Sequence, residues 1–479
     1  MAGSERPTRV SVAGFRRALT ELEGITGAPV SSAPVRLRAR TTSLDTPYRA
    51  GEAAAAALAA GARIAAGLAE KQGTGIGTID VDSRHAESSL VSFAHLKFLD
   101  PERGLGPRQP GEVRTAAAGF YRTRDDRWIY LHAGFPHNTK GLLALLDATD
   151  DRRAVTKAVR RWRAAELEDA IADAGLCGAM VRDAAEWDSS AAGRLLGSRP
   201  VVEIVQVGDS DPEPLPGAGD RPLDGVRVLD LTRILAGPTC ARTLAFYGAD
   251  ALRVGAERLP SVGLFVADTG FGKRACYLDL TRPKDAGRLR RLVRQADVFS
   301  QGYRSGAMER LGFGVTEVAQ ARPGIVYVSI NCYGHEGPWR PRPGWEQLAQ
   351  TVTGMAAAQG THLRQDAPTL LPAAVNDYIT GYLAAVGTLA ALARRAEQGG
   401  SYWVRVSLAR TAMWVRSLGT RPSVVPKPTT ASEIERFSTR TDSAWGPLSY
   451  LEPAVTVEGL RIGWDRPPSP LGADRPTFA

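Results

Sequence analysis

The chain has 479 residues, of which 43% are apolar and 23% charged, and its formal net charge is +9. The length indicates two or three domains, and the composition is typical of an ordinary soluble globular protein. The basic residues are mixed with acidic ones along the chain and form no basic tail, so the pattern disfavours a nucleic-acid-binding protein.

Targeting and metal signals are absent from the pattern. MAGSERPTRV at the start is polar, unlike a signal peptide, and the Ala-rich runs are interrupted by Arg63 and by Arg394. The cysteines at 177, 240, 276 and 332 are far apart, and no Cys or His grouping has metal-ligand spacing. We therefore expect free thiols, a cytoplasmic location, no membrane partner and no metal site.

The first 207 residues predict two units. Residues 1–115 form a partial α/β segment, with a helix at 52–70, a strand at 79–81, a helix at 86–99 and a loop at 100–115. Residues 116–207 form a small α+β domain, with a hairpin at 120–131, helices at 138–147 and 151–174, and a strand at 201–207. Residues 208–222, GDSDPEPLPGAGDRP, have the composition of a linker.

Residues 223–479 predict an α/β domain with a C-terminal tail. Strands and helices alternate at 226–231, 238–247, 250–254, 276–280, 284–296 and 325–330. That order is typical of a Rossmann-like parallel sheet with a ligand crevice at its strand ends. The glycine fingerprint of a dinucleotide site is missing, which disfavours an NAD-dependent dehydrogenase. Residues 421–445, rich in Pro, Ser and Thr, have the composition of a second linker.

The chain also contains an internal repeat. Residues 58–81 align without gaps to residues 383–406, at an offset of 325, and both segments predict a helix, a turn and a strand. The matched turn and strand favour partial duplication over a chance likeness between two Ala-rich helices.

Several motifs of the second half resemble the class III CoA-transferases, the family of the formyl-CoA and carnitine-CoA transferases and the methylacyl-CoA racemases. They are GKR at 272–274 with YLDL at 277–280, ADV at 296–298, GAMERLG at 306–312 and the tail at 446–473. In that family a small α+β domain interrupts the α/β domain, and two chains interlock. Here a segment similar to the small domain lies at 116–207 instead of 418–440. The resemblance implies a rearranged or partly duplicated architecture and a homodimer.

The resemblance places the catalytic carboxylate at Asp377. A carboxylate suits CoA transfer because its acyl anhydride stays reactive. Asp377 stands where a helix is expected to begin, a place that favours the anionic form. An N-cap aspartate is the alternative interpretation. Glu346 matches an acidic position near the family's active site and is otherwise a surface acid at a helix start. In the first copy the position of Asp377 falls on Glu52, which indicates an inactive remnant.

The resemblance also implies a binding site for CoA. It places the turn at Ile234, Leu235 and Ala236 against CoA, and it places basic residues near the phosphates at Arg258, Lys273, Arg274 and Arg310. Each of these basic residues is otherwise an ordinary surface charge. Two departures stand out: Leu235 replaces a Gln of the formyl-CoA branch, and residues 100–118 contain no match to that branch's Gly-rich loop.

We therefore expect an enzyme that moves CoA between carboxylic acids through an aspartyl–acyl anhydride on Asp377. Its substrates would be an acyl-CoA and a carboxylic acid acceptor, and no tightly bound cofactor is implied. Two alternatives stay open. One is a racemase or another CoA-ester enzyme, although Trp345 replaces the racemase branch's catalytic His. The other is a catalytically silent acyl-CoA-binding protein.

Overall fold

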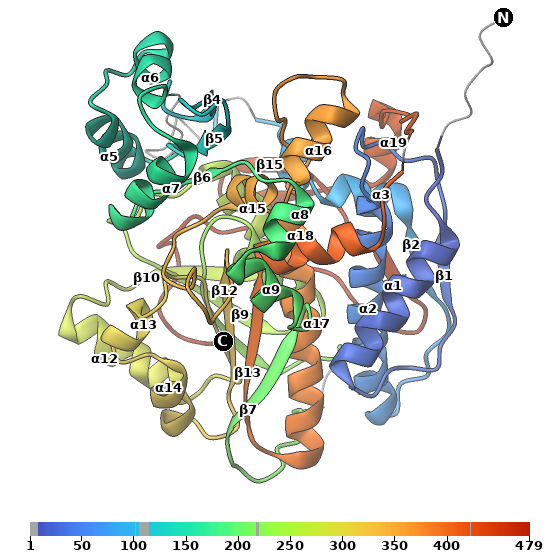
Figure 1. Cartoon of the computed structure of the whole chain (residues 1–479). Coiled ribbons are helices and arrows are strands. Elements are labelled where there is room, and N and C mark those ends of the chain that lie inside the picture. The colour runs from blue at the N-terminus through green and yellow to red at the C-terminus, as the bar shows by residue number, and fades with distance from the viewer. Residues whose placement is uncertain (1–7, 101, 105–114, 217–219, 422) are drawn as a thin grey trace, which may run out of the picture.

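The computed structural model describes residues 8–100, 102–104, 115–216, 220–421 and 423–479. Its largest sheet has seven strands in the order β10-β9-β8-β11-β12-β13-β7 (Figure 1). All neighbours are parallel except β7, which is antiparallel to β13. The parallel strands, taken in chain order, follow the 3-2-1-4-5-6 arrangement of Rossmann-like domains. The predicted α/β class is confirmed.

The strands of this sheet are β7 (Glu203–Gly208), β8 (Arg227–Leu231), β9 (Asp250–Gly255), β10 (Lys273–Tyr277), β11 (Val298–Gln301), β12 (Val326–Asn331) and β13 (Ser401–Ser407). The helices of the same half are α10 (Ala236–Phe246), α11 (Gly263–Thr269), α12 (Pro283–Val293), α13 (Ala307–Arg310), α14 (Val315–Ala321), α15 (Glu346–Val352), α16 (Met355–His362), α17 (Val375–Gln398) and α18 (Leu408–Ser417).

Helices cover both faces of the sheet because successive strand residues point to opposite sides. Val228 and Val298 belong to the core cluster that contains residues of α10 and α17. Leu229 and Phe299, each one residue further on, belong to a second cluster with residues of α12 and α14. The near-continuous apolar strands therefore reflect burial on both faces.

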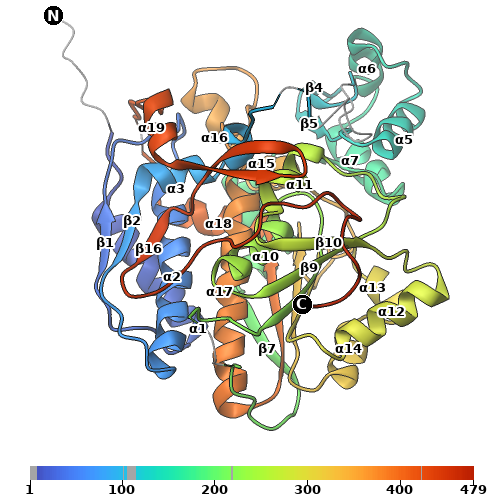
Figure 2. The same cartoon turned by 180° about the vertical axis from the view of Figure 1, so that it is seen from behind.

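The N-terminal part adds a second, smaller α/β unit. It consists of α1 (Val12–Thr26), β1 (Val35–Arg38), α2 (Ala50–Lys71), β2 (Ile79–Asp82), α3 (Ser83–Ser89), α4 (Ser92–His95) and β3 (Lys97–Phe98). The parallel pair β1–β2 is joined through α2, and β16 (Val455–Val457) lies antiparallel on the other edge of β2 (Figure 2).

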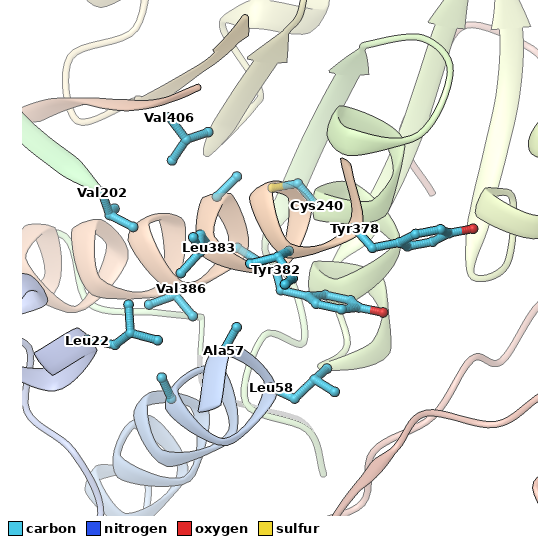
Figure 3. Packing of buried hydrophobic residues seen from close by; sticks show 14 of the residues in the cluster. Leu22, Ala57, Leu58, Val202, Cys240, Tyr378, Tyr382, Leu383, Val386 and Val406 are labelled. Atoms are coloured by element: carbon cyan, nitrogen blue, oxygen red, sulfur yellow. The ribbon is translucent and has the colours of Figure 1, made fainter. Parts of the chain in front are cut away.

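The two units repeat one design. In both, a long helix leads into the second of two parallel strands, α2 between β1 and β2 and α17, after α15 and α16, between β12 and β13, and an antiparallel strand completes the edge. The helices α2 and α17 begin 325 residues apart, at Ala50 and Val375. They pack against each other near Gly61 and Val386, which are also 325 residues apart, while Ala57 and Leu383 lie on the facing surfaces (Figure 3). The repeat in the sequence is thus matched by a repeat in structure.

Between the two units in the chain comes a compact α+β region, which lies at the upper left of Figure 1. It contains β4 (Gly119–Arg122), β5 (Trp128–Leu131), α5 (Pro136–Leu146), α6 (Arg152–Val159), α7 (Ala164–Asp173) and β6 (Gly178–Met180). The two short helices that follow, α8 (Ala184–Ser189) and α9 (Ala191–Gly197), share a core cluster with residues of α17 and α18 instead. β4, β5 and β6 form an antiparallel sheet, and residues of α5, α6 and α7 share a core with it.

Some elements differ from the sequence predictions. The strand expected at 201–207 is β7 and joins the large sheet instead of the small one. The helix expected at 86–99 is broken, because the carbonyl of Leu90 accepts a hydrogen bond from the backbone of Ala374. The helix expected at 151–174 is divided before α7, where Asp125 caps the amide of Ala164.

The composition of 421–445 was misleading as a linker signal. This segment contains α19 (Ala431–Arg436) and β14 (Ser438–Ser443), and β14 pairs with β15 (Gly446–Leu451). Thr430 and Glu433 form a capping box that starts α19, a signal that is readable from the sequence. The loop expected at 100–115 falls largely outside the described residues.

Helix α2 is long and apolar enough to span a membrane by length and composition, but 94% of its apolar window is buried inside the fold. Its alanines pack against α1, α3 and α17. The four cysteines are buried and free.

Candidate active site

The site lies where the order of the large sheet reverses, between β8 and β11. Open α/β sheets bind ligands outside the carboxyl ends of their strands at such a switch point. The turn from β8 into α10 contains Ile234, whose φ of 70° is left-handed. A β-branched residue adopts this conformation only where the surrounding structure imposes it, and such strain gathers at functional sites.

A crevice opens beside this turn, at the carboxyl ends of β8 and β9. It is lined by Thr232, Arg233, Ile234, Arg253, Gly255, Ala256, Leu259, Ser261, Val262, Phe265, Val266 and Leu471. Leu235 and Ala236, the two other turn residues that the sequence predicted to lie against CoA, are buried and do not line the crevice. The lining is mostly apolar, with two arginines.

The two arginines of the crevice, Arg233 and Arg253, were not predicted from the sequence. Neither makes an ion pair with any residue that the structure describes, and Nη1 of Arg253 is buried without a hydrogen-bond partner. Burial lowers the pKa of both guanidinium groups, and for Arg253 the carboxylate of Asp230 opposes this effect. Arg253 is buried with its Nη1 unpaired, an arrangement that favours an anionic ligand, whereas Arg233 is half-buried and donates to the backbone oxygen of Pro260. Arg253 could have been found from the sequence, because it is the one charged residue among the apolar strand residues 251–254.

Two of the predicted phosphate-binding residues have protein partners instead. Lys273 is buried, and its Nζ lies 2.8 Å from a carboxylate oxygen of Asp230 on β8. Arg274 donates two hydrogen bonds to Asp250, at 2.7 and 2.9 Å. These contacts hold β8, β9 and β10 together. Because both side chains are paired, β10 can begin with basic residues, at Lys273 instead of at the predicted residue 276.

The other two predicted basic residues lie at the surface. Arg258 pairs with Asp279 at 3.2 Å and lines a separate open crevice together with Tyr277 and Lys284. Arg310 is exposed on α13. Their contact with CoA phosphates stays a prediction.

Asp377 and Glu346 come together as a buried pair. Asp377 is the third residue of α17, whereas the N-cap, Ala374, makes no side-chain cap. Glu346 begins α15 and accepts hydrogen bonds from the backbone N–H groups of Asn376, at 3.1 Å, and Asp377, at 2.6 Å. The side-chain amides of Gln350 and Asn376 also donate to it, at 2.7 and 3.2 Å. Glu346 is thus the acid that caps α17, not a surface acid.

The carboxylate of Asp377 is left without such support. Its oxygens accept no hydrogen bond from any residue that the structure describes, so the N-cap interpretation is wrong. Burial and then the nearby charge of Glu346 raise the pKa of Asp377 well above its usual range. Burial raises the pKa of Glu346 to about 7, against the effect of its four donors. The expectation that the helix N-terminus would dominate is therefore corrected: burial raises the pKa of both carboxyls, and for Asp377 the neighbouring Glu346 adds to the effect.

The helix that carries Asp377 touches the turn at the crevice. A Cβ atom at Gly381, one helical turn after Asp377, would lie 2.5 Å from the backbone oxygen of Ala236. Only glycine permits this close approach of α17 to the start of α10. This contact places α17 against the turn that borders the crevice, whose lining includes neither Asp377 nor Glu346.

The α+β region closes the other side of the site. The ring of His132 stacks on Trp345 at 5.4 Å, and Phe135 lies 5.1 Å from the same indole. The thiol of Cys332 points at the backbone oxygen of Trp345 at 3.7 Å. Trp345 thus connects the α+β region to Glu346, its neighbour in the chain.

The equivalent position in the first unit is sealed. Glu52, at the start of α2, is fully buried and pairs with Arg421 and, at 3.2 Å, with Arg49. The backbone of Ser11 donates a further hydrogen bond to it at 3.0 Å. All of these contacts go to Oε1 of Glu52, whereas its Oε2 is buried without a hydrogen-bond partner among the described residues.

Comparison with known proteins identifies the family. The model of "CoA-transferase family III" matches residues 38–213 and 223–442. The acetyl-coenzyme A transferase nodX of Hypoxylon pulicicidum is 34% identical over 345 residues, which are 67% of this chain and 58% of that protein. A probable fatty acyl-CoA transferase of Mycobacterium tuberculosis, Rv3272, is 29% identical over 249 residues, which are 47% of this chain and 63% of that protein.

Among solved structures, a crystal structure of Rv3272 covers 41% of this chain and 56% of its own, with 30% identity and a TM-score of 0.39. The chain spans somewhat more than half the length of the two acyl-CoA and acetyl-CoA transferases to which it is 34% identical. The family match extends over both the N-terminal and the C-terminal part, and on that basis the chain belongs to CoA-transferase family III.

Proposed function

We propose that this protein is an acyl-CoA transferase that moves CoA from one carboxylic acid to another, with Asp377 as its nucleophile. The observation that carries the proposal is the carboxylate of Asp377: it is buried, lacks hydrogen-bond donors and lies one helical turn from the contact of α17 with the crevice turn. A family match to CoA-transferases and relatives named as acyl-CoA or succinyl-CoA transferases support this reading.

The reaction would proceed by successive acyl exchanges at Asp377. A carboxylate oxygen attacks the thioester carbonyl of the donor, the C–S bond breaks, and CoA leaves as the thiolate. The thiolate then attacks the aspartyl carbonyl of the resulting anhydride and releases the donor acid. The acceptor carboxylate attacks the aspartyl thioester, and the returning thiolate takes the acceptor acyl group from the second anhydride. Asp377 is regenerated, and each exchange conserves charge.

Glu346 would control the proton of the pair. Asp377 attacks only as an anion, and the raised pKa of the buried pair means that one proton is retained near neutral pH. When this proton resides on Glu346, Asp377 is ionised. A carboxylate with a raised pKa is also the stronger nucleophile, because nucleophilicity increases with basicity. The four donors to Glu346 hold its orientation in both protonation states.

Binding would supply the remainder of the rate. Arg233 and Arg253 would meet the phosphates of CoA in the crevice, and the pantetheine arm would follow the turn at 232–236 toward Asp377. We also propose, as for the family, a homodimer in the cytoplasm without a tightly bound cofactor. The acyl-CoA donor and the acceptor acid would be its small-molecule partners.

The experiment is covalent trapping. The protein is incubated with acetyl-CoA, succinyl-CoA or a longer acyl-CoA and then treated with hydroxylamine, and tryptic peptides are analysed by mass spectrometry. We expect a hydroxamate on Asp377 and no label on Asp366, an exposed aspartate shortly before α17. A label on another residue, or no label with any of the donors, would overturn the proposal.

A further inference from the structure

The first unit contacts both the start of α17 and a wall of the crevice. The contacts come from the segment Leu90–Phe93, which connects α3 to α4. The carbonyl of Leu90 accepts a hydrogen bond from the backbone N–H of Ala374 at 3.1 Å, immediately before α17 begins. Because Ala374 precedes Asp377 by three residues, this bond ties the first unit to the helix start that carries the nucleophile.

The hydroxyl of Ser92 makes the next contact. Its Oγ lies 2.9 Å from Oδ2 of Asp268 and 3.0 Å from the hydroxyl oxygen of Tyr378, the residue after Asp377. The hydroxyl of Tyr378 donates to the same Oδ2 at 2.9 Å. All three side chains are buried, and hydrogen bonds within such a network are stronger than bonds exposed to water.

The carboxylate of Asp268 joins four helices. Asp268 lies on α11, and Phe265 of the same helix lines the crevice. Nη1 of Arg242 on α10 donates to Asp268 at 3.1 Å, and α10 begins at the crevice turn. Ser92 comes from α4 and Tyr378 from α17. One buried carboxylate thus connects the crevice wall, the crevice turn and the nucleophile helix, and the first unit supplies one of its donors.

The ring of Phe93 forms a second bridge to the crevice wall. It meets the ring of Phe265 edge-on, with the centroids 4.9 Å apart. It also stacks on the ring of Tyr378 at 6.5 Å, and Figure 3 shows that ring projecting from α17. Both contacts are of the kind that aromatic pairs favour. Phe93 therefore spans the distance between the crevice wall and the residue next to Asp377.

The position of the nucleophile depends on these contacts because its side chain has no hydrogen bonds of its own. The carboxylate of Asp377 accepts none from any residue that the structure describes, so its place is set by the backbone of α17. Glu346 binds two N–H groups of that backbone. The first unit binds it at Ala374 and through the side chain of Tyr378.

We propose that Ser92 and Phe93 are positioning residues that set Asp377 relative to the crevice, so that the first unit is part of the active site of the second. This inference rests on the proposed function and assigns a role to the duplicated unit, whose own acid, Glu52, is sealed. A displacement of about 1 Å caused by a change away from the reacting atoms can lower a rate about 100-fold.

The test measures single-turnover acylation of Asp377 in full-length variants, with a saturating concentration of whichever acyl-CoA labels it. Ser92→Ala and Phe93→Leu should each lower the rate constant about tenfold or more. The Kd for CoA should change less than about threefold, because the described lining of the crevice includes neither residue. Phe93→Tyr, which keeps the ring, should acylate within about threefold of the wild-type rate.

Matched controls lie in the same unit. Ser88 is also a buried serine, but its hydroxyl donates within α3, and Phe15 is a phenylalanine in the core between α1 and α2. Ser88→Ala and Phe15→Leu should keep the wild-type acylation rate even where they lower the thermal midpoint. If these controls lose as much acylation as Ser92→Ala and Phe93→Leu, the first unit acts only through stability and the inference is wrong.

Hydrogen exchange at residues 375–381 adds a measurement that needs no turnover. These amides should exchange about tenfold faster in Ser92→Ala and Phe93→Leu than in the wild type or the controls. Labelling of Asp377 at the wild-type rate in both variants would overturn this inference and leave the proposed function intact. If no donor labels Asp377, exchange decides alone: faster exchange in these two variants only would support the positioning role, and equal exchange in variants and controls would overturn it.

Discussion

The backbone N–H of Asp377 donates to Oε2 of Glu346 at 2.6 Å, so the acid that caps α17 lies beside the acid in the first turn of that helix. One carboxyl receives four donors and the other receives none among the described residues. Because of this asymmetry, substitutions at Asp377 and at Glu346 should change the pH dependence of the protein differently.

The buried carboxylate of Asp377 should cost stability. The pKa of Asp377 is higher in the folded protein than the value of about 3.9 in the unfolded chain. The group therefore favours the folded state below the unfolded pKa, and this stabilisation is lost as the pH rises through the folded pKa. Asp377→Asn should therefore raise the thermal midpoint by about 2 °C or more at pH 8, with little effect at pH 4. Differential scanning calorimetry across this range checks it, with exposed Asp366→Asn as the control. A loss of midpoint at pH 8 would contradict the assignment.

Glu346 should set the pH below which the acylation of Asp377 becomes slow. Glutamine at this position keeps an oxygen for the backbone N–H groups but removes the charge that raises the pKa of Asp377. In Glu346→Gln the rate of hydroxamate formation should therefore decline at a lower pH than in the wild type. Single-turnover labelling between pH 4 and pH 8 measures this. If the labelling rate of Glu346→Gln instead declines at a higher pH than that of the wild type, Glu346 does not act through its charge.

The arginines of the crevice should contribute more to CoA binding than the arginine of β10. Because Arg233 and Arg253 lack carboxylate partners among the described residues, Arg233→Gln and Arg253→Gln should each raise the Kd for CoA about tenfold. Arg274→Gln, which removes a partner of Asp250, should change it less than about threefold. Isothermal titration at fixed salt distinguishes them. Equal losses in all three would mean that the crevice is not the phosphate site.

Racemase chemistry should be undetectable. The position of the racemase branch's base holds Trp345, and the histidine that stacks on it, His132, has its pKa lowered to about 4 by burial. A base of that strength is poorly matched to proton abstraction from carbon at neutral pH. In D2O, 2-methylacyl-CoA should acquire deuterium at the α-carbon no faster with the protein than with a heat-inactivated sample. Exchange that disappears in His132→Gln would instead favour the racemase alternative.

The ion pair between Glu52 in the first unit and Arg421 should contribute to the free energy of unfolding. Arg421→Met leaves the buried carboxylate of Glu52 with a weakened ion pair and should destabilise the fold by about 3 kcal/mol or more. The half-exposed pair of Arg199 with Glu336 offers the control, since Arg199→Met should cost no more than about 1 kcal/mol. Urea unfolding followed by circular dichroism compares the two. Equal costs would argue that Glu52 is not tightly held.

The sequence was most informative where local pattern and tertiary packing agree. The alternation of apolar strands with helices in 223–331 predicted the parallel sheet, because strands buried on both faces are apolar throughout. The start of α17 was placed correctly because the motif before Asp377 ends as the helical periodicity begins. Breaks such as the one at Leu90 could not be read from the sequence, since their cause is a hydrogen bond from Ala374, distant in the chain.

The site was predicted in part for the same reason. Asp377 and Glu346 were both singled out, but their electrostatic relation depends on how α15 meets α17, a contact between separate segments. The basic residues show the limit of motif matching. Lys273 and Arg274 match the family pattern, yet they pair with Asp230 on β8 and Asp250 on β9. Arg253, which has an unpaired buried nitrogen, lies inside an apolar strand and matches no motif.

The pairing of β2 with β16 has a consequence for biosynthesis. β2 is made early, but its second neighbour, residues 455–457, is synthesised more than 370 residues later. Until then an edge of the small sheet has no partner strand from that segment, and unpaired edges recruit other chains. A ribosome-bound nascent chain therefore carries an open edge through most of its synthesis, and that edge stays available to other chains until residues 455–457 emerge.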